Sequence, residues 1–136
     1  MECVYCKGDT RVTNSRRQKR NNQVWRRRQC LKCGAVFTSH EVMDFSSALL
    51  VDASGSAKPF LADLLYTEVL LALQDRKDCY SAAREVTNTV IRQLLKLPEK
   101  PLFSPKQITL ATSKVLKRFD GRAYLRYAAE HPSLQA

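Results

Sequence analysis

The sequence has little of what membrane, secreted or repetitive proteins contain. Its 136 residues include only four glycines and five prolines, which excludes a collagen-like or low-complexity chain. The longest apolar runs, such as residues 69–73, are far shorter than the roughly 20 residues that a membrane-spanning helix needs. The N-terminus lacks the charged and then apolar pattern of a secretion signal. We therefore expect a cytoplasmic protein with no membrane partner.

Signatures of catalysis are also missing. The chain contains no HExxH, GxSxG, P-loop or GxGxxG pattern, and its acidic residues form no paired arrangement. Its only histidines are His40, beside the cysteine-rich region, and His131, in a C-terminal stretch that looks exposed. We interpret both as ordinary polar residues. The sequence therefore predicts no catalytic residues and a protein that is not an enzyme.

Positive charge is plentiful and unevenly placed. Lys and Arg outnumber Asp and Glu by 23 to 13, which gives a net charge of +10. Residues 1–43 alone hold ten of these cations and only three of the acids. Such a concentration favours a polyanionic partner, with nucleic acid ahead of an anionic membrane.

Four of the five cysteines form two CxxC pairs, Cys3 with Cys6 and Cys30 with Cys33, separated by 23 residues. Each pair can place two thiolates on one side of a metal ion, and two pairs complete a tetrahedral site. Strand-like stretches at residues 10–14, 24–29 and 35–39 surround the pairs. The spacing predicts a zinc ribbon with one structural zinc ion. Two disulfides, four reduced thiols or a redox CxxC are the alternatives, and the paired spacing in a cytoplasmic chain favours zinc.

Three consecutive arginines, Arg26 to Arg28, follow Trp25 in the second strand-like stretch. Strand alternation predicts that Arg27 shares a face with Trp25, and that Arg26 and Arg28 share the other. A strand with three arginines is not a core strand, so at least one face meets solvent. A second basic segment, residues 16–20, is expected to form a flanking loop. The alternative is a merely solvated charge run; we favour nucleic-acid contact, and charge alone does not separate DNA from RNA.

The rest of the chain predicts helices behind a short hairpin. Residues 48–51 resemble a strand and residues 53–56 a turn, whereas residues 61–73 are apolar nearly all round and suit a central buried helix. Further helices are expected at residues 81–97, from Ser104 to about residue 119, and at 122–130. The predicted fold class is α+β. Its parts are a zinc ribbon at residues 1–43, a mostly helical domain at 44–131 and a tail at 132–136.

Several motifs, in order, resemble the NrdR family, the bacterial repressors of ribonucleotide reductase genes. The family's R-V-x-x-S-R, RRRR-x-C-x-x-C and R-F-T-T-x-E motifs are similar to residues 11–16, 25–33 and 36–41 here. Its closing L-D-x-x-A-Y-x-R-F-A motif is similar to residues 119–128. The resemblance implies a zinc-dependent repressor that binds double-stranded DNA as a homo-oligomer. The arginines expected to contact DNA are Arg11, Arg16, Arg17, Arg26, Arg27 and Arg28.

The family's second part is an ATP-cone, a hairpin-plus-helices domain that senses ATP and dATP. The resemblance implies that residues 44–131 form such a domain, with nucleotide-binding positions at Val51, Gly55, Lys58 and Phe60. This chain departs from the family at the first strand of the cone. Where the family has V-x-K-R, with basic residues that approach the nucleotide, residues 50–53 read L-V-D-A.

Two hypotheses follow from these observations. In the first, the protein is a DNA-binding repressor of ribonucleotide reductase genes, controlled by nucleotide-dependent oligomerisation. In the second, it is a constitutive nucleic-acid-binding or assembly module whose ATP-cone has lost nucleotide binding. The intact ribbon and C-terminal motif favour the first hypothesis, and the missing cations favour the second.

Overall fold

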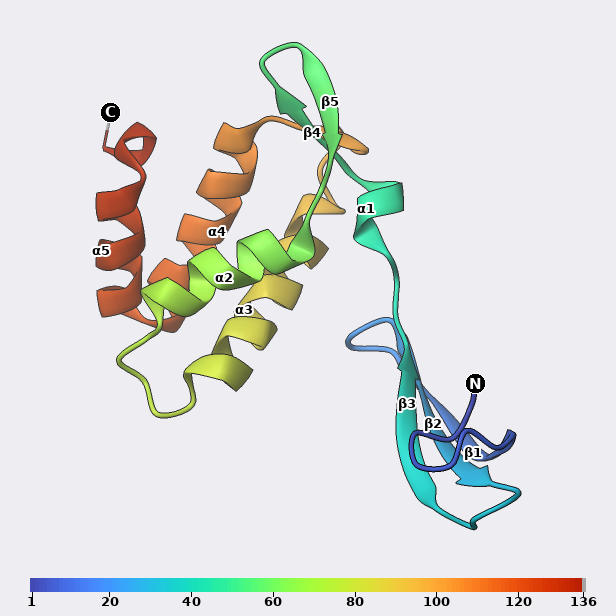
Figure 1. The fold of residues 1–136 in the computed structure, drawn as a ribbon. Helices are drawn as coiled ribbons and strands as arrows, with labels where there is room; N and C mark the ends of the chain where they lie inside the picture. Colours follow the sequence, from blue (N-terminus) through green and yellow to red (C-terminus); the bar gives the residue numbers. More distant parts are fainter. Residues whose placement is uncertain (136) are drawn as a thin grey trace. The chain divides into compact units, whose positions relative to one another are not determined.

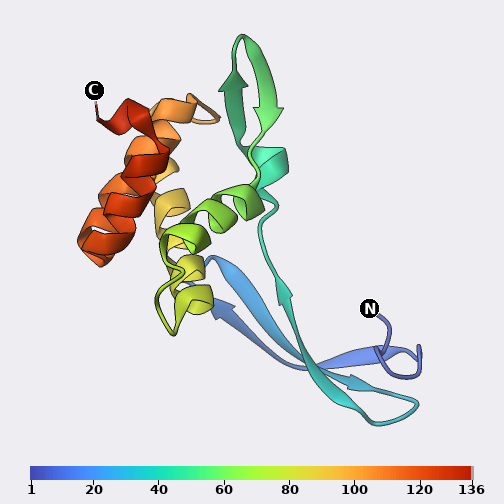
Figure 2. The same cartoon turned by 60° about the vertical axis from the view of Figure 1, so that its left-hand side comes forward.

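The computed structural model describes residues 1–135 and has the α+β architecture that the sequence predicts. It divides into two compact units, Met1–Met43 and Asp44–Ala136. The first unit contains a three-stranded sheet, and the second contains all the helices of the described residues (Figures 1 and 2). Within residues 1–135, no helix is both long enough and apolar enough to cross a membrane.

The first unit is an antiparallel sheet in the order β1-β2-β3. The first strand extends beyond the predicted residues 10–14 and includes Arg16 and Arg17, so our expectation of a basic loop at these two positions is wrong. Pairing continues to Gln18 opposite Gln23, which leaves only four residues for the turn. The strands are β1 (Thr10–Gln18), β2 (Gln23–Cys30) and β3 (Val36–Glu41).

The second unit packs four main helices beside a small sheet of order β5-β4-β6 (Figure 1). The sequence did not predict β6, which has two residues and pairs in parallel with β4, nor the one-turn helix α1. A short 3-10 helix, Pro132–Leu134, lies in the predicted tail, whose residue 136 falls outside the described residues. The remaining elements are α1 (Phe45–Ala48), β4 (Leu50–Ala53), β5 (Ser56–Pro59), α2 (Ala62–Ala72), α3 (Cys79–Leu94), β6 (Leu102–Phe103), α4 (Pro105–Phe119) and α5 (Gly121–Glu130).

A tight turn joins β4 to β5. Ser54 and Gly55 have φ values of 55° and 88°, and Ala53 pairs with Ser56, which makes a two-residue hairpin loop. The carboxylate of Asp52 accepts a hydrogen bond from the Gly55 amide at 3.0 Å. Asp52, at a position where the resemblance implies a lysine, is therefore used locally to form the turn.

The helical core is made of buried aliphatic and aromatic side chains from all four main helices and from β6. Helix α2 contributes Leu65 and Val69 to it, but Leu64 and Leu71 on the same helix are 58% and 60% exposed. Our expectation of an entirely buried central helix is therefore wrong. Apolar character all round α2 reflects a core on one side and, on the other, cavities that are open to solvent.

Arg76 and Asp120 connect the loop before α3 to the junction of α4 and α5. Arg76 donates to Asp120 at 3.3 Å and to Asp78 at 2.8 Å, and its guanidinium lies 5.0 Å from the ring centroid of Phe119. Asp120 also caps α5 by accepting from the amides of Arg122 and Ala123. These amides, with Arg76, hold the pKa of Asp120 below its usual range.

Replacing Asp120 by alanine should destabilise the helical unit by about 1–2 kcal/mol at pH 7, because a helix cap and an ion pair are lost together. Since the folded-state pKa is lowered, this stabilisation is present above the unfolded pKa and disappears as the pH falls through the folded value. Thermal unfolding followed by circular dichroism at pH 7 and pH 3 measures both effects. Asp63→Ala, at an exposed acid in the first turn of α2, is the control. An equal effect of Asp120→Ala at both pH values would contradict this account.

Candidate metal centre and nucleic-acid interface

Four cysteine sulfurs from the two CxxC pairs converge at the end of β2. The Sγ atoms of Cys3, Cys6, Cys30 and Cys33 all lie within 4.8 Å of one another. The Cys3 and Cys33 sulfurs are 3.7 Å apart, and the Cys6 and Cys30 sulfurs are 3.5 Å apart. Each of these two close contacts therefore joins one cysteine of the first CxxC pair to one cysteine of the second.

These separations fit a tetrahedral zinc ion. Zinc–sulfur bonds of about 2.3 Å place the ligand sulfurs of a tetrahedral site about 3.8 Å apart. A disulfide would need sulfurs only about 2.05 Å apart, so the distances do not fit the alternative of two disulfides. Four thiolates fill the coordination shell and leave no open position, as in structural rather than catalytic zinc sites.

Backbone amides favour the thiolate form that a metal requires. Cys30 Sγ accepts from the amides of Cys33 at 3.4 Å and Lys32 at 3.3 Å, and these bonds, the Cys33 bond foremost, lower the pKa of Cys30 to about 6. The Gly8 amide favours the Cys6 thiolate, but the neighbouring sulfurs outweigh it and raise the pKa of Cys6 to about 12. Crowded thiolates repel one another, and a central cation removes that repulsion.

The metal site also takes the place of a hydrophobic core in this unit. Among residues 1–43, only Cys3 and Cys30 are buried. A unit of this size without a core does not fold on apolar burial alone. A structural zinc ion supplies on the order of 10 kcal/mol, so the ribbon depends on its metal.

Two glycines fit the chain closely around the cysteines. Gly34, directly after the second pair, has φ +73°, a conformation that favours glycine. Gly8 follows the first pair, and a Cβ at this position would lie 2.9 Å from Lys32 Cβ and 3.3 Å from Cys6 Sγ. Gly8 is therefore required for close approach, and Gly34 for its backbone angle.

The register of the ribbon sorts its arginines onto two faces. Arg16 pairs with Trp25 and Arg27 pairs with Asn14, and residues that pair directly share a face. On β3, His40 pairs with Trp25. The Arg16 guanidinium lies 5.8 Å from the centroid of the Trp25 ring, a cation–π contact. We call the surface formed by Arg11, Arg16, Trp25, Arg27 and His40 the tryptophan face.

A β-bulge places Arg11 on the tryptophan face. The pairing of β1 with β2 shifts between Val12 and Asn14, where Thr13 is the extra residue and donates its hydroxyl to the Arg27 carbonyl at 3.2 Å. Without the extra residue, strand alternation would place Arg11 opposite to Arg16. The bulge reverses that parity, and Arg11 pairs with Gln29 on the face of Arg27.

Two of the three arginines on the opposite face of the sheet are held in internal contacts. Arg26 forms an ion pair with Glu41, which is the only acidic residue in the three strands. Arg28 donates to the hydroxyl groups of Ser39 at 2.9 Å and Thr10 at 3.5 Å. Arg17 lies on this face as well and is exposed. The tryptophan face, by contrast, has three exposed arginines and no carboxylate from any of the three strands.

Comparison with known proteins gives the same family from a model of the N-terminal domain and from relatives that align along nearly the whole chain. The family model described as "Transcriptional repressor NrdR-like, N-terminal domain" matches residues 1–41. The transcriptional repressor NrdR of Bartonella henselae is 35% identical over 130 residues, which cover 95% of this chain and 81% of the relative. The chain belongs to the NrdR family. The repressors of Symbiobacterium thermophilum and Caulobacter vibrioides are 32% and 33% identical, and each alignment covers 95% of this chain and 85% and 82% of the relative.

Membership in the NrdR family and the sulfur geometry together assign one structural zinc ion to the four cysteines. The zinc ribbon that the spacing predicts is thus confirmed. The chain is a zinc-dependent member of a family of transcriptional repressors, and its ribbon is the part that the family model recognises.

The helical unit has a cavity of about 570 Å³ beneath the hairpin, which we call the hairpin cavity. Three of the four nucleotide-binding positions that the resemblance implies, Val51, Lys58 and Phe60, line it together. The fourth, Gly55, is in the hairpin turn and does not line the cavity. The size is within the range of small-molecule sites.

Two residues of the hairpin cavity, Glu68 and His131, are not predicted by the sequence pattern. Glu68, on α2, is half-buried, and burial raises its pKa while His131 partly opposes the rise. His131 is not a free tail residue, because its ring stacks on Tyr127 at 4.0 Å between centroids and its Nδ1 donates to the Tyr127 carbonyl at 2.8 Å. Nothing in the local pattern places a residue near position 131 beside one at position 68, since that proximity comes from helix packing.

Gly8→Ala should weaken zinc binding by about tenfold or more, because the new methyl group displaces Lys32 and the ligand sulfurs beside it. Competition with a chromophoric chelator measures the zinc affinity. Gly121→Ala is the matched control, since a Cβ at Gly121 meets nothing within 4 Å. Equal zinc affinity in the Gly8→Ala variant and the wild type would show that the close packing around Gly8 does not support the metal site.

Proposed function

We propose that this protein is a zinc-dependent repressor that binds double-stranded DNA through the tryptophan face of its ribbon. The observation that carries the proposal is the concentration of Arg11, Arg16 and Arg27 on one face that has no carboxylate from the strands. Exposed guanidinium groups that are not neutralised by a carboxylate are suited to phosphates, and arginine can also donate two hydrogen bonds to a guanine edge.

Duplex DNA accounts for the arrangement better than a solvated charge run does. A surface that only meets solvent has no physical reason to separate its neutralised cations from its free ones. Here Glu41 neutralises Arg26 on one face, and no acid from the three strands lies on the other face. Trp25 lies among the tryptophan-face arginines and is half-buried, with Arg16 over its ring. This contact limits the motion of the Arg16 side chain, so less conformational entropy is lost when it meets a phosphate.

The NrdR relatives are named as transcriptional repressors, and the resemblance implies ribonucleotide reductase genes as targets. We infer the same class of target for this chain. A homo-oligomer is part of the proposal, because a single ribbon covers a short stretch of duplex and paired half-sites increase both affinity and selectivity.

Control of DNA binding is assigned to the helical unit, with an adenine nucleotide bound in the hairpin cavity. Support comes from the cavity that Val51, Lys58 and Phe60 form together, and from walls of Leu and Ile side chains that suit a purine base. In this proposal, the bound nucleotide changes the association of subunits and thereby the number of ribbons that can reach DNA at once.

Two double variants test the proposed DNA face. Arg16→Ala with Arg27→Ala removes two tryptophan-face arginines, and Arg17→Ala with Arg26→Ala removes the same charge from the opposite face. We expect the first pair to weaken binding by about 10- to 100-fold. It should also reduce the salt slope, log K against log salt, by about two, because two fewer phosphates are neutralised in the complex.

Fluorescence anisotropy with a labelled duplex from the control region of a ribonucleotide reductase gene measures both quantities. The opposite-face pair should keep affinity within about threefold of the wild type, because Arg26 is already bound to Glu41. Zinc content is measured on each variant and should not change. Equal reductions of affinity in the two variants, or a flat salt dependence of the wild type, would contradict the assignment of the DNA face.

A further inference from the structure

The hairpin cavity contains very little positive charge. Nine of its thirteen lining residues are apolar, and the four others are Lys58, Glu68, Thr109 and His131. Lys58 is the only lysine or arginine among them, and no carboxylate in residues 1–135 lies within ion-pair distance of it. Ala53, on the first strand of the hairpin, also lines the cavity and adds no charge. The walls can therefore hold an apolar or aromatic group, and Lys58 is their one permanent cation.

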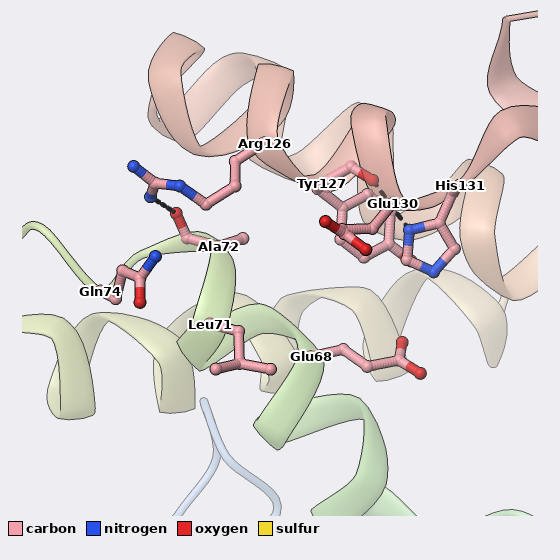
Figure 3. Close-up of a pocket in the computed structure, with 8 residues that line it drawn as sticks. All are labelled: Glu68, Leu71, Ala72, Gln74, Arg126, Tyr127, Glu130 and His131. Carbon is pink, nitrogen blue, oxygen red and sulfur yellow. Dashed lines mark hydrogen bonds between the residues drawn. The ribbon is translucent and has the colours of Figure 1, made fainter.

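The cavity next to it supplies no further cation. It has a volume of about 510 Å³ and shares Glu68 and His131 with the hairpin cavity (Figure 3). Its only Lys or Arg is Arg126, which donates to the Ala72 carbonyl at 2.6 Å and forms an ion pair with Asp75. Arg126 therefore already has partners, and Glu68 and Glu130 add carboxyl groups to the same region.

The start of α4, at the edge of the hairpin cavity, is also poorly suited to phosphate. Helix N-termini bind anions through free amides. Here Pro105 has no amide hydrogen, and a capping box uses the amides on either side: Ser104 N–H donates to Gln107 Oε1 at 2.8 Å, and Gln107 N–H donates to Ser104 Oγ at 3.2 Å. Two amides at the start of the helix are therefore already used, and the proline offers none.

We propose that the hairpin cavity takes a ligand with an apolar or aromatic body and at most one phosphate group. This inference rests on the proposed nucleotide control, and within that class it selects a nucleoside or nucleoside monophosphate over a triphosphate. The base contacts Val51, Phe60 and Ile108, and a single phosphate pairs with Lys58. The residues present do not fit a triphosphate.

The reason is electrostatic. Each further phosphate adds negative charge that meets no additional lysine or arginine on the walls, and the carboxyl group of Glu68 lines the same cavity. Glu68 offers no positive charge in either protonation state. When ionised it repels phosphate, and when protonated it supplies a single donor. A triphosphate thus loses hydration and gains little in return.

Isothermal titration calorimetry on the full-length, zinc-loaded protein tests the inference with adenosine, AMP and ATP, and with their deoxy forms. We expect AMP or adenosine to bind at least about tenfold more tightly than ATP, corresponding to about 1.4 kcal/mol. Tighter binding of ATP than of AMP overturns this inference and leaves nucleotide control intact. If none of the six ligands binds, both this inference and the proposed nucleotide control are overturned. The DNA proposal is then judged separately by the arginine variants.

Charge variants identify the groups involved. Lys58→Gln should weaken the binding of AMP by about fivefold, because one partly exposed ion pair is lost, and should leave the affinity for adenosine unchanged. Glu68→Gln should strengthen ATP binding, because a carboxylate no longer faces the added phosphates. Lys114→Gln, an exposed lysine on α4 outside the cavity, is the matched control and should change nothing. If Lys58→Gln weakens adenosine as much as AMP, Lys58 is not the phosphate partner and the proposal fails.

Discussion

The ribbon depends on one interaction, the bonding of four thiolates to a single cation. No other element of residues 1–43 can replace it, because the only buried side chains in that stretch are Cys3 and Cys30. The three strands pair by backbone hydrogen bonds, but both faces of their sheet are largely open to water. A sheet of this kind is marginal by itself, and the metal supplies the free energy that a hydrophobic core would otherwise provide.

Because the metal stabilises the fold of the ribbon, the sheet does not need apolar side chains and can carry many arginines. The extra residue Thr13 then decides which arginines act together, since it brings Arg11 to the face of Arg16 and Arg27. The helical unit follows the opposite pattern. It folds around an apolar core, its hairpin cavity has one lysine and no arginine, and Arg76 and Arg126 form ion pairs with carboxylates of the same unit. The exposed arginines of the tryptophan face are therefore open to a partner, whereas Arg76 and Arg126 are held within the helical unit.

Much of this organisation can be predicted from the sequence, where the signal is local. Two CxxC pairs specify a metal site, and helical periodicity with Ser104 and Pro105 marks α4 to within a residue. Features set by long-range pairing could not be predicted. No local pattern distinguishes the bulge at Thr13, the parallel pairing of β6 with β4, or the meeting of Glu68 with His131. The apolar residues of α2 predicted burial, but periodicity cannot distinguish a wall of the core from a wall of a cavity.

The most direct test of the account is to remove zinc from the full-length protein with a chelator while DNA affinity and the far-ultraviolet helical signal are measured together. The account predicts that DNA affinity falls by about 100-fold or more, that the helical signal is retained, and that affinity recovers when zinc is restored. A zinc-free protein that binds the duplex as tightly as the zinc-loaded protein would contradict the claim that the metal holds the arginine-bearing sheet in its binding form.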